Sequence, residues 1–187
     1  DCEFPDILYD WTKNDFIQDW VRKRAALNIK HSTNKQQRHP YEPCFLFESG
    51  ILPLSKYPLK GVIWYQGESN TSQPYEYAKL LPTMITSWRK SFDQKKLPFI
   101  YAQLPNFMEA NDSPSESDWA VFREMQTKTL SVPATAMTVN IDLGDWNDIH
   151  PMNKKDVAKR LVLAARRIAY NDRNVGRISC NQVVAVY

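Results

Sequence analysis

Histidine is the side chain best suited to acid–base chemistry near neutral pH, and one of the three histidines in this sequence has unusual neighbours. His150 follows an apolar run and lies in an acidic turn that also contains Asp142, Asp145 and Asp148. A hydrolase base needs an imidazole whose second nitrogen is held by an acceptor, and such a turn can supply one. His150 is therefore a candidate general base. In the alternative interpretation, Asp148 and Asn147 only cap the helix that follows.

The remaining histidines and the cysteines give no sign of a metal site. His31 and His39 lie in a polar, proline-containing loop without a nearby carboxylate, and both are expected to be ordinary surface residues. Cys2, Cys44 and Cys180 are far apart and lack the paired spacing of zinc ligands. A structural zinc site is not expected. One disulfide with one free thiol and three unpaired thiols both remain open.

A second polar cluster, QGESN, begins at Gln66 directly after the apolar run GVIWY. A side-chain amide at the end of a buried strand can donate a hydrogen bond to a developing oxyanion. Glu68 can orient other residues of the same loop. The alternative is a hydrogen-bonded turn between a strand and a helix. Ser69 is not expected to be a nucleophile, because the elbow motif GxSxG needs a second glycine where Thr71 stands.

The elements that must position these residues alternate along the chain. Short apolar runs with β-branched and aromatic residues predict strands that are buried on both faces. These strands are expected at residues 61–65, 98–104 and 135–142. Amphipathic patterns predict helices over residues 75–92, 118–130 and 153–170. The alternation predicts a parallel α/β sheet with right-handed crossovers and helices on both faces, and functional residues at the carboxyl ends of the strands.

The two ends of the chain are less regular. Residues 6–30 carry a helical pattern, residues 31–44 are expected to form a loop, and residues 45–52 are expected to form a helix that ends before Pro53. The apolar stretch near the C-terminus can begin a further strand. The family resemblance described below implies that residues 1–187 are one partial domain. Its expected parts are a helical insertion and loop at 1–40, core α/β units at 41–172 and a tail or further strand at 173–187.

Composition excludes several classes of protein. Hydrophobic residues make up 43% of the chain, which is enough for a packed core. The formal net charge is only +3, from 24 basic and 21 acidic residues, which does not favour nucleic-acid binding. No apolar stretch approaches the ~18 residues of a membrane span. The first residues lack the basic and then apolar pattern of a secretory leader.

Four segments together resemble the sialate O-acetylesterase family of the SGNH hydrolase superfamily. They are GVIWYQGESN at 61–70, SDWAVFREMQ at 117–126, IDLGDWNDIHPMNKKDVAKRLVLAARRIAY at 141–170 and the lead-in PCFLFESGILPLSKYPLKG. The similarity is collinear from about residue 41 to residue 170. WYQGESN followed in order by DIHP is the specific combination.

The resemblance implies a flavodoxin-like SGNH hydrolase domain with three α/β/α layers, present here as an incomplete C-terminal portion. It implies a carbohydrate O-acetylesterase of the sialate 9-O-acetyl type with a Ser-His(-Asp) acyl-enzyme mechanism. The family's nucleophilic serine lies in a GQSNM-type motif, which this chain does not contain. The chain alone is therefore expected to be inactive. No metal or organic cofactor is implied.

The same resemblance assigns roles to individual residues. His150 and Pro151 match the His–Pro motif, so His150 is the expected base. Gln66 is the expected oxyanion donor. The residues assigned to oxyanion and substrate binding are Gln66, Gly67, Glu68, Arg123 and Gln126. The last two are expected to be positioning residues near the site.

The third member of the triad remains open. Many SGNH enzymes have an aspartate three positions before the histidine, where this chain has Asn147. Asp148 is the first candidate and Asp145 the second. A Ser–His dyad whose histidine is oriented by a backbone carbonyl is the further alternative.

The expected partner is an O-acetylated carbohydrate, with neither nucleic acid nor membrane. The other expected partner is the missing N-terminal half of the same domain, or a second copy of the chain through self-association of exposed surface. The resemblance also suggests a secreted or periplasmic location. The alternatives are a non-catalytic carbohydrate-binding or pseudoenzyme module and an acetylxylan-type esterase. All site assignments depend on one expectation: the Gln66 amide and the His150 imidazole project from neighbouring strand ends into one pocket.

Overall fold

The computed structural model describes residues 17–34, 37–113 and 115–175. They fall into two compact units, one that ends at Pro58 and one that begins at Leu59. The predicted helical start before residue 17 and the predicted apolar segment after residue 175 lie outside the described residues. The domain limits expected from the sequence remain a prediction. Within the described ranges no helix combines the length and apolar character needed to cross a membrane.

The first unit contains helix α2, Asp19–Ile29, which confirms part of the predicted helix. The described residues between Ile29 and residue 45 form no helix or strand, as expected for a loop. A π-helical turn at Phe47–Ile51 is then followed by a 3-10 turn at Leu52–Leu54. The prediction of a helix that ends before Pro53 is confirmed, because the π-helical turn ends at Ile51 and a separate 3-10 turn begins at Leu52. Pro53 occupies the first turn of the new helix, where its missing N–H costs no hydrogen bond.

The first unit also corrects the interpretation of one histidine and one cysteine. His39 is buried: its Nδ1 accepts a hydrogen bond from the Tyr41 backbone N–H at 3.1 Å, and its Nε2 lies 3.1 Å from the Asn28 amide nitrogen. It is a packed structural residue, so the surface prediction is wrong for His39, whereas His31 is exposed as predicted. Cys44 is disulfide-bonded, which excludes three unpaired thiols. The other two cysteines lie outside the described residues.

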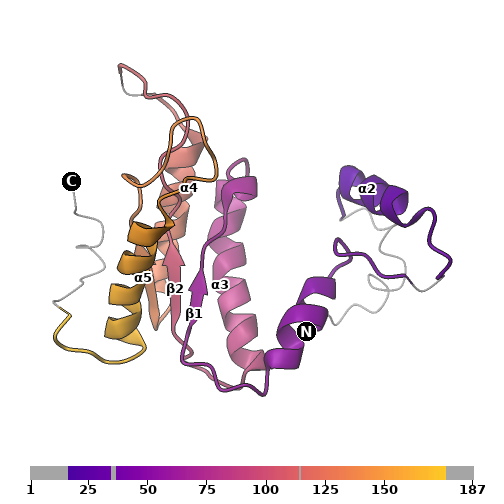
Figure 1. The fold of residues 1–187 in the computed structure, drawn as a ribbon, viewed down its shortest axis with the longest axis horizontal. Coiled ribbons are helices and arrows are strands. Elements are labelled where there is room, and N and C mark those ends of the chain that lie inside the picture. Colours follow the sequence, from indigo (N-terminus) through magenta and orange to yellow (C-terminus); the bar gives the residue numbers. More distant parts are fainter. Residues whose placement is uncertain (1–16, 35–36, 114, 176–187) are drawn as a thin grey trace. The chain divides into compact units, whose positions relative to one another are not determined.

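The second unit is a parallel α/β structure. Its strands are β1, Val62–Trp64, β2, Phe99–Ala102, and β3, Thr135–Thr138, and all pairs are parallel in the order β1-β2-β3. The long helices are α3, Pro74–Ser91, α4, Asp118–Lys128, and α5, Lys154–Ile168. A short 3-10 turn at Glu68–Asn70 follows β1, and another at Thr129–Ser131 follows α4. These elements confirm the predicted strand–helix alternation (Figure 1).

Helices cover both faces of this sheet. Because successive side chains of a strand point to opposite faces, each strand can contact helices on both sides. The Phe99 ring packs against Trp88 of α3, and the Tyr101 hydroxyl donates to the Gln126 carbonyl of α4 at 2.9 Å. The intervening residues of β2 face α5. They belong to one cluster, which consists of Ile100, Ala102, Ala136, Leu143, Val157, Leu161 and Ala164. The three α/β/α layers of the expected fold class are therefore confirmed.

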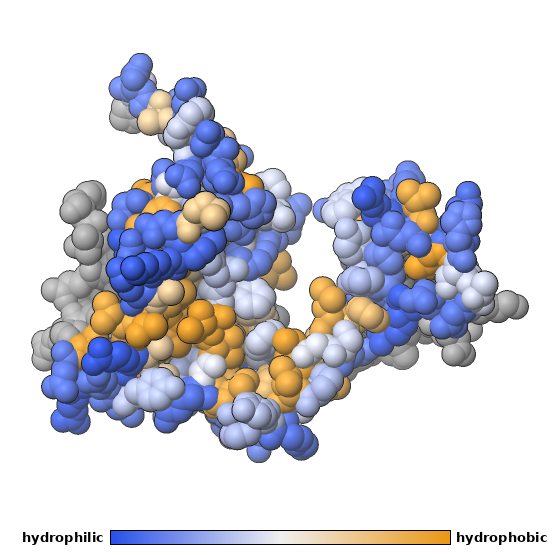
Figure 2. Space-filling view, in the orientation of Figure 1, coloured by the Kyte–Doolittle hydropathy of each residue, from blue (hydrophilic) through white to orange (hydrophobic). Residues whose placement is uncertain are grey.

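Strand β1 is less buried than its sequence suggests. All four residues of β2 are buried, whereas the side chain of Ile63 in β1 is 57% exposed. No described strand pairs with the outer edge of β1, and α5 packs over β2 and β3. The prediction that this strand is buried on both faces is therefore wrong. Apolar surface lies where β1 and α5 run in the ribbon view (Figure 2).

Candidate active site

The loops that follow the strands lie at one edge of the sheet, because the strands are parallel. The loop after β2 is hydrogen-bonded to the loop that contains His150. The Asn106 Oδ1 accepts the Gly144 N–H at 2.8 Å, and the Trp146 carbonyl accepts the Met108 N–H at 2.8 Å. A Cβ atom on Gly144 would come within 2.1 Å of the Asn106 carbonyl oxygen. The absence of a side chain there is what permits this close approach.

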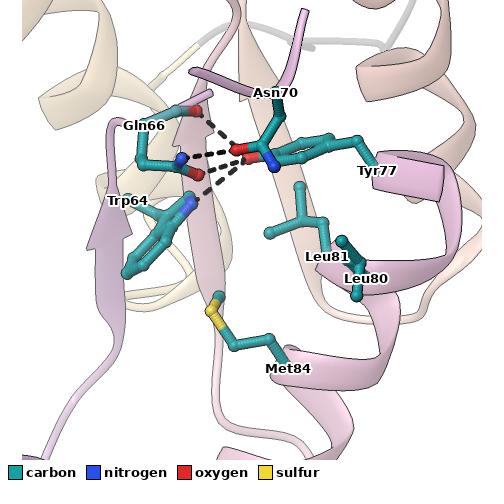
Figure 3. A pocket seen from close by; sticks show the side chains of 7 residues that line it. All are labelled: Trp64, Gln66, Asn70, Tyr77, Leu80, Leu81 and Met84. Atoms are coloured by element: carbon teal, nitrogen blue, oxygen red, sulfur yellow. Dashed lines mark hydrogen bonds between the residues drawn. The ribbon is translucent and has the colours of Figure 1, made fainter. Parts of the chain in front are cut away.

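Gln66 follows β1, and its carboxamide is held at both ends (Figure 3). Its Nε2 donates to the Asn70 Oδ1 at 2.8 Å. Its Oε1 lies 3.2 Å from the Tyr77 hydroxyl, which also lies 3.1 Å from the Gln66 backbone carbonyl. An amide nitrogen carries two protons, so one N–H of Gln66 remains for another acceptor. Gln66 therefore has the donor that its predicted role requires.

A cavity of about 230 Å³ opens beside this amide. The polar groups lie at its upper end in Figure 3, and its walls are otherwise apolar side chains of β1 and α3. The lining residues are Trp64, Gln66, Asn70, Tyr77, Leu80, Leu81 and Met84. His150 is not among them. That Gln66 and His150 share one pocket remains a prediction.

Gly67 is placed where only glycine fits. Its φ is +151°, and a Cβ atom built there would lie 2.7 Å from the Phe122 ring and 3.7 Å from the Gln126 Nε2. Its N–H donates to the Glu68 carboxylate at 3.0 Å. Gly67 thus lets the QGESN loop rest directly on α4. Glu68 closes the loop on itself rather than reaching another element.

Replacing Gly67 with alanine is expected to destabilise the chain by about 2–4 kcal/mol, because strained backbone and an overpacked ring contact each cost roughly 1–3 kcal/mol. Urea unfolding would measure the loss. Gly50→Ala is the matched control, since nothing lies within 4 Å of a Cβ at Gly50 and its φ is not positive. Equal unfolding midpoints for the two variants would show that the contact with Phe122 is not restrictive.

Gln126 is buried, and its side chain forms hydrogen bonds with the backbone at the end of β2. Its Oε1 accepts the Leu104 N–H at 2.9 Å, and its Nε2 donates to the Ala102 carbonyl at 3.3 Å. These bonds satisfy backbone groups at the end of β2, where the sheet ladder stops. The Gln126 Nε2 also lies 3.7 Å from the position that a Cβ atom on Gly67 would occupy, so Gln126 lies near the loop that follows β1 as well. This geometry fits the expected positioning role of Gln126. Nothing in it supports a direct contact between Gln126 and a substrate.

Arg123 lies one position after Phe122 on α4 and is half-buried. Burial lowers the pKa of its guanidinium, because a low-polarity environment disfavours the charged form. No carboxylate pairs with it among the described residues. Its backbone carbonyl accepts a hydrogen bond from the Gln103 side chain at 3.1 Å. Arg123 is thus a half-buried cation whose charge is not neutralised by a described acidic residue.

His150 is exposed on the loop between β3 and α5. The Asp148 Oδ1 accepts the backbone N–H of His150 at 2.7 Å, so this carboxylate braces the main chain. Asp145 and Asp148 form a backbone bridge, and Asp145 is exposed. In the structure neither carboxylate is bonded to the imidazole ring. The helix α5 is capped by Asn153, so the interpretation of Asp148 and Asn147 as its caps is wrong.

Asp142, the remaining carboxylate near His150, is engaged elsewhere. Arg160 of α5 donates to both of its oxygens at 2.7 and 2.6 Å. The hydrogen bonds from Arg160 lower the pKa of Asp142, so the pair stays ionised at neutral pH. This ion pair connects the loop that contains His150 to α5. In the part of the chain that the structure describes, no group of three or more His, Cys, Asp or Glu side chains is arranged to hold a metal ion.

One contact connects the Gln66 and His150 regions. The ammonium of Lys154, at the start of α5, lies 5.0 Å from the ring centroid of Tyr65. Tyr65 immediately precedes Gln66 and packs against the α5 side of the core. The loop of His150 therefore ends close to the residue where the Gln66 loop begins. Both regions lie at the same edge of the sheet, as their sequence positions predicted.

The sequence did not reveal two of the residues around Gln66. Asn70 lies in the recognised QGESN run but had no assigned role, and Tyr77 was expected only as part of the buried face of a helix. The 3-10 turn Glu68–Asn70 brings Asn70 back toward Gln66. The first turn of α3 brings the Tyr77 hydroxyl to the same amide. A tyrosine at the polar end of an otherwise apolar helix stripe was the only available signal.

Comparisons with known proteins agree with this architecture. A family described as carbohydrate esterase, sialic acid-specific acetylesterase, matches residues 18–166. The sialate O-acetylesterases of Mus musculus and Homo sapiens are 35% and 33% identical to the chain, each over 154 residues, or 73% of it. The chain spans 28% and 29% of their respective lengths.

A solved structure extends the comparison to the fold. It is a carbohydrate acetylesterase from Xanthomonas citri that is 49% identical to the chain, with a TM-score of 0.59. The similarity covers 64% of this chain and 28% of that protein. The matched family covers most of the chain, including both the Gln66 loop and the His150 loop. The chain therefore belongs to the carbohydrate esterase family of sialic acid-specific acetylesterases.

Proposed function

We propose that this chain supplies the general base and one oxyanion donor of a carbohydrate O-acetylesterase that works through an acyl-enzyme. The observation that carries the proposal is the Gln66 amide, fixed at the carboxyl end of β1 with one N–H available. Family membership supports the reaction class. The exposed His150 loop at the same edge of the sheet supports the assignment of the base.

The nucleophilic serine is proposed to come from a segment that this chain does not contain. We use "complete domain" for this chain together with that segment. His150 takes the serine proton while the serine oxygen attacks the acetyl carbonyl carbon. Gln66 Nε2–H and backbone N–H groups stabilise the resulting oxyanion. Collapse of the intermediate breaks the bond to the sugar oxygen, which receives the proton from His150.

The second half of the reaction uses the same groups. Water attacks the acetyl-serine carbonyl and gives a proton to His150, and the oxyanion again rests on Gln66. Collapse releases acetate, and His150 returns the proton to the serine oxygen. The imidazole needs an acceptor on its other nitrogen throughout. Asp148 is the first candidate, because one of its oxygens already bonds to the His150 backbone; Asp145 and a backbone carbonyl are the others.

The proposed substrate is an O-acetylated sialic acid, in keeping with the names of the similar sialate O-acetylesterases, and the 9-O-acetyl ester is the form that the family resemblance implies. Acetate release by the complete domain from O-acetylated sialic acid, from acetylated xylan and from p-nitrophenyl acetate would test this choice. Preference for xylan would assign the acetylxylan-type activity instead. Binding of the sugar without acetate release would favour a non-catalytic carbohydrate-binding module.

Replacing Gln66 with alanine in the complete domain is expected to lower kcat by about 10²–10³-fold, the usual cost of removing one oxyanion-hole donor. KM should change little, because the bond is made to the charge that develops in the transition state. Gln73→Ala is the control. This exposed glutamine is only seven residues away, and its side chain does not cap α3. Wild-type kcat in the Gln66→Ala variant would remove Gln66 from the mechanism.

A further inference from the structure

We propose that Tyr77 is a positioning residue that aims the Gln66 amide at the reacting carbonyl oxygen. This inference rests on the proposed function, because it assigns a role to Tyr77 only through Gln66. Tyr77 lies on α3, and its ring is buried against Phe122 at a centroid distance of 4.6 Å. Its hydroxyl lies within hydrogen-bond distance of the Gln66 side-chain oxygen, the Gln66 backbone carbonyl and the Trp64 indole nitrogen (Figure 3).

The roles in this network follow from which atoms can donate. The Trp64 indole nitrogen is only a donor, and it lies 3.4 Å from the Tyr77 oxygen, which must accept. The Gln66 backbone carbonyl and the Gln66 Oε1 are both only acceptors, so the single Tyr77 proton points toward Gln66 and is shared between these two oxygens, 3.1 and 3.2 Å away. The amide oxygen therefore faces Tyr77. The amide nitrogen faces the opposite way, toward Asn70.

Donation to Oε1 also changes the strength of the remaining N–H. A hydrogen bond to an amide oxygen polarises the whole amide and strengthens its nitrogen as a donor. Burial raises the pKa of the Tyr77 phenol, so the hydroxyl keeps its proton across the neutral range. Asn70 then takes one of the two amide protons. The second proton has a fixed direction before any substrate arrives, which is the arrangement that an oxyanion donor needs.

The main test is Tyr77→Phe in the complete domain. Removing the hydroxyl frees one end of the amide, so kcat should fall about tenfold, less than the full loss of an oxyanion donor, while KM changes little. Tyr101→Phe is the matched control. It also removes a buried hydroxyl that donates to a backbone carbonyl, at 2.9 Å, but this bond goes to Gln126 and not to Gln66. This control should lower stability and leave kcat unchanged.

A double-mutant cycle separates positioning from general structural support. If Tyr77 acts through Gln66, adding Tyr77→Phe to Gln66→Ala should cause no further loss of kcat. Multiplied losses, or a wild-type kcat in Tyr77→Phe alone, would overturn the inference and leave the role of Gln66 intact. A wild-type kcat in Gln66→Ala would overturn both. These outcomes distinguish failure of the inference from failure of the proposed function.

Asn70→Ala provides a second route if Tyr77→Phe folds poorly. Asn70 lies on a short surface turn and holds the other end of the same amide, so its loss should not threaten the core. We expect kcat to fall in the same range and again to show no further loss in the Gln66→Ala background. An unchanged kcat, or a loss that multiplies with that of Gln66→Ala, would show that fixing this amide does not contribute to the reaction.

Discussion

Replacing His150 with alanine in the complete domain is expected to lower kcat by about 10⁴-fold or more, because base and nucleophile act as one unit. Without the imidazole, no group takes the serine proton or delivers it to the leaving sugar oxygen. The residual rate would come from the oxyanion donors alone. Acetate release from an O-acetylated sugar, followed under single-turnover conditions, would separate this chemical defect from weaker binding.

His31→Ala is the matched control for this variant. Both histidines are exposed, and neither imidazole has a described hydrogen-bond partner, so both variants should unfold at the wild-type urea concentration. Because the bond from Asp148 is made to the His150 backbone N–H, it is kept in the alanine variant. A His150→Ala variant that retains wild-type kcat would show that another group is the base. Loss of activity in His31→Ala as well would point to a general effect on the protein.

The sheet could be predicted from the sequence because its signals are local. Runs such as GVIWY and PFIYAQL, separated by amphipathic stretches, are sufficient to indicate strands, crossovers and the edge where loops meet. The burial of β1 could not be predicted in the same way. Ile63 has the sequence pattern of a core residue, but its exposure depends on which elements cover it, and this is decided by segments far away in the chain. His39 was missed for the same reason.

The site shows the same division between local and distant information. Gln66 and His150 could be recognised from short motifs next to strand ends. The role of Tyr77 depends on the register of α3 against β1, and that of Gln126 depends on which backbone groups at the end of β2 lack partners. The tyrosine at the polar end of the apolar stripe of α3 is the only sequence signal for the first relation, and the second relation has none. Asp148 illustrates the opposite case: its sequence position suggests an imidazole partner, while its carboxylate binds a backbone N–H.

This chain by itself is expected to have no esterase activity, which is the largest effect predicted here. Its sequence contains no GQSN or GxSxG motif, and Ser69 lies in an exposed 3-10 turn without an imidazole bonded to it. An isolated serine hydroxyl is a weak nucleophile, because an adjacent base is needed to activate it. The purified chain should therefore show no p-nitrophenyl acetate hydrolysis that a fluorophosphonate probe blocks, and the probe should leave its mass unchanged.

The complete domain provides the positive control under the same conditions, and it should lose activity when treated with the probe. Turnover by the chain alone that the probe blocks would mean that one of its own serines is the nucleophile. Mass spectrometry would then identify the modified residue. Slow turnover that the probe does not block has a different cause, since an exposed imidazole such as that of His150 can attack an activated ester directly. Natural acetyl sugars, which have a poor leaving group, should not react in that way.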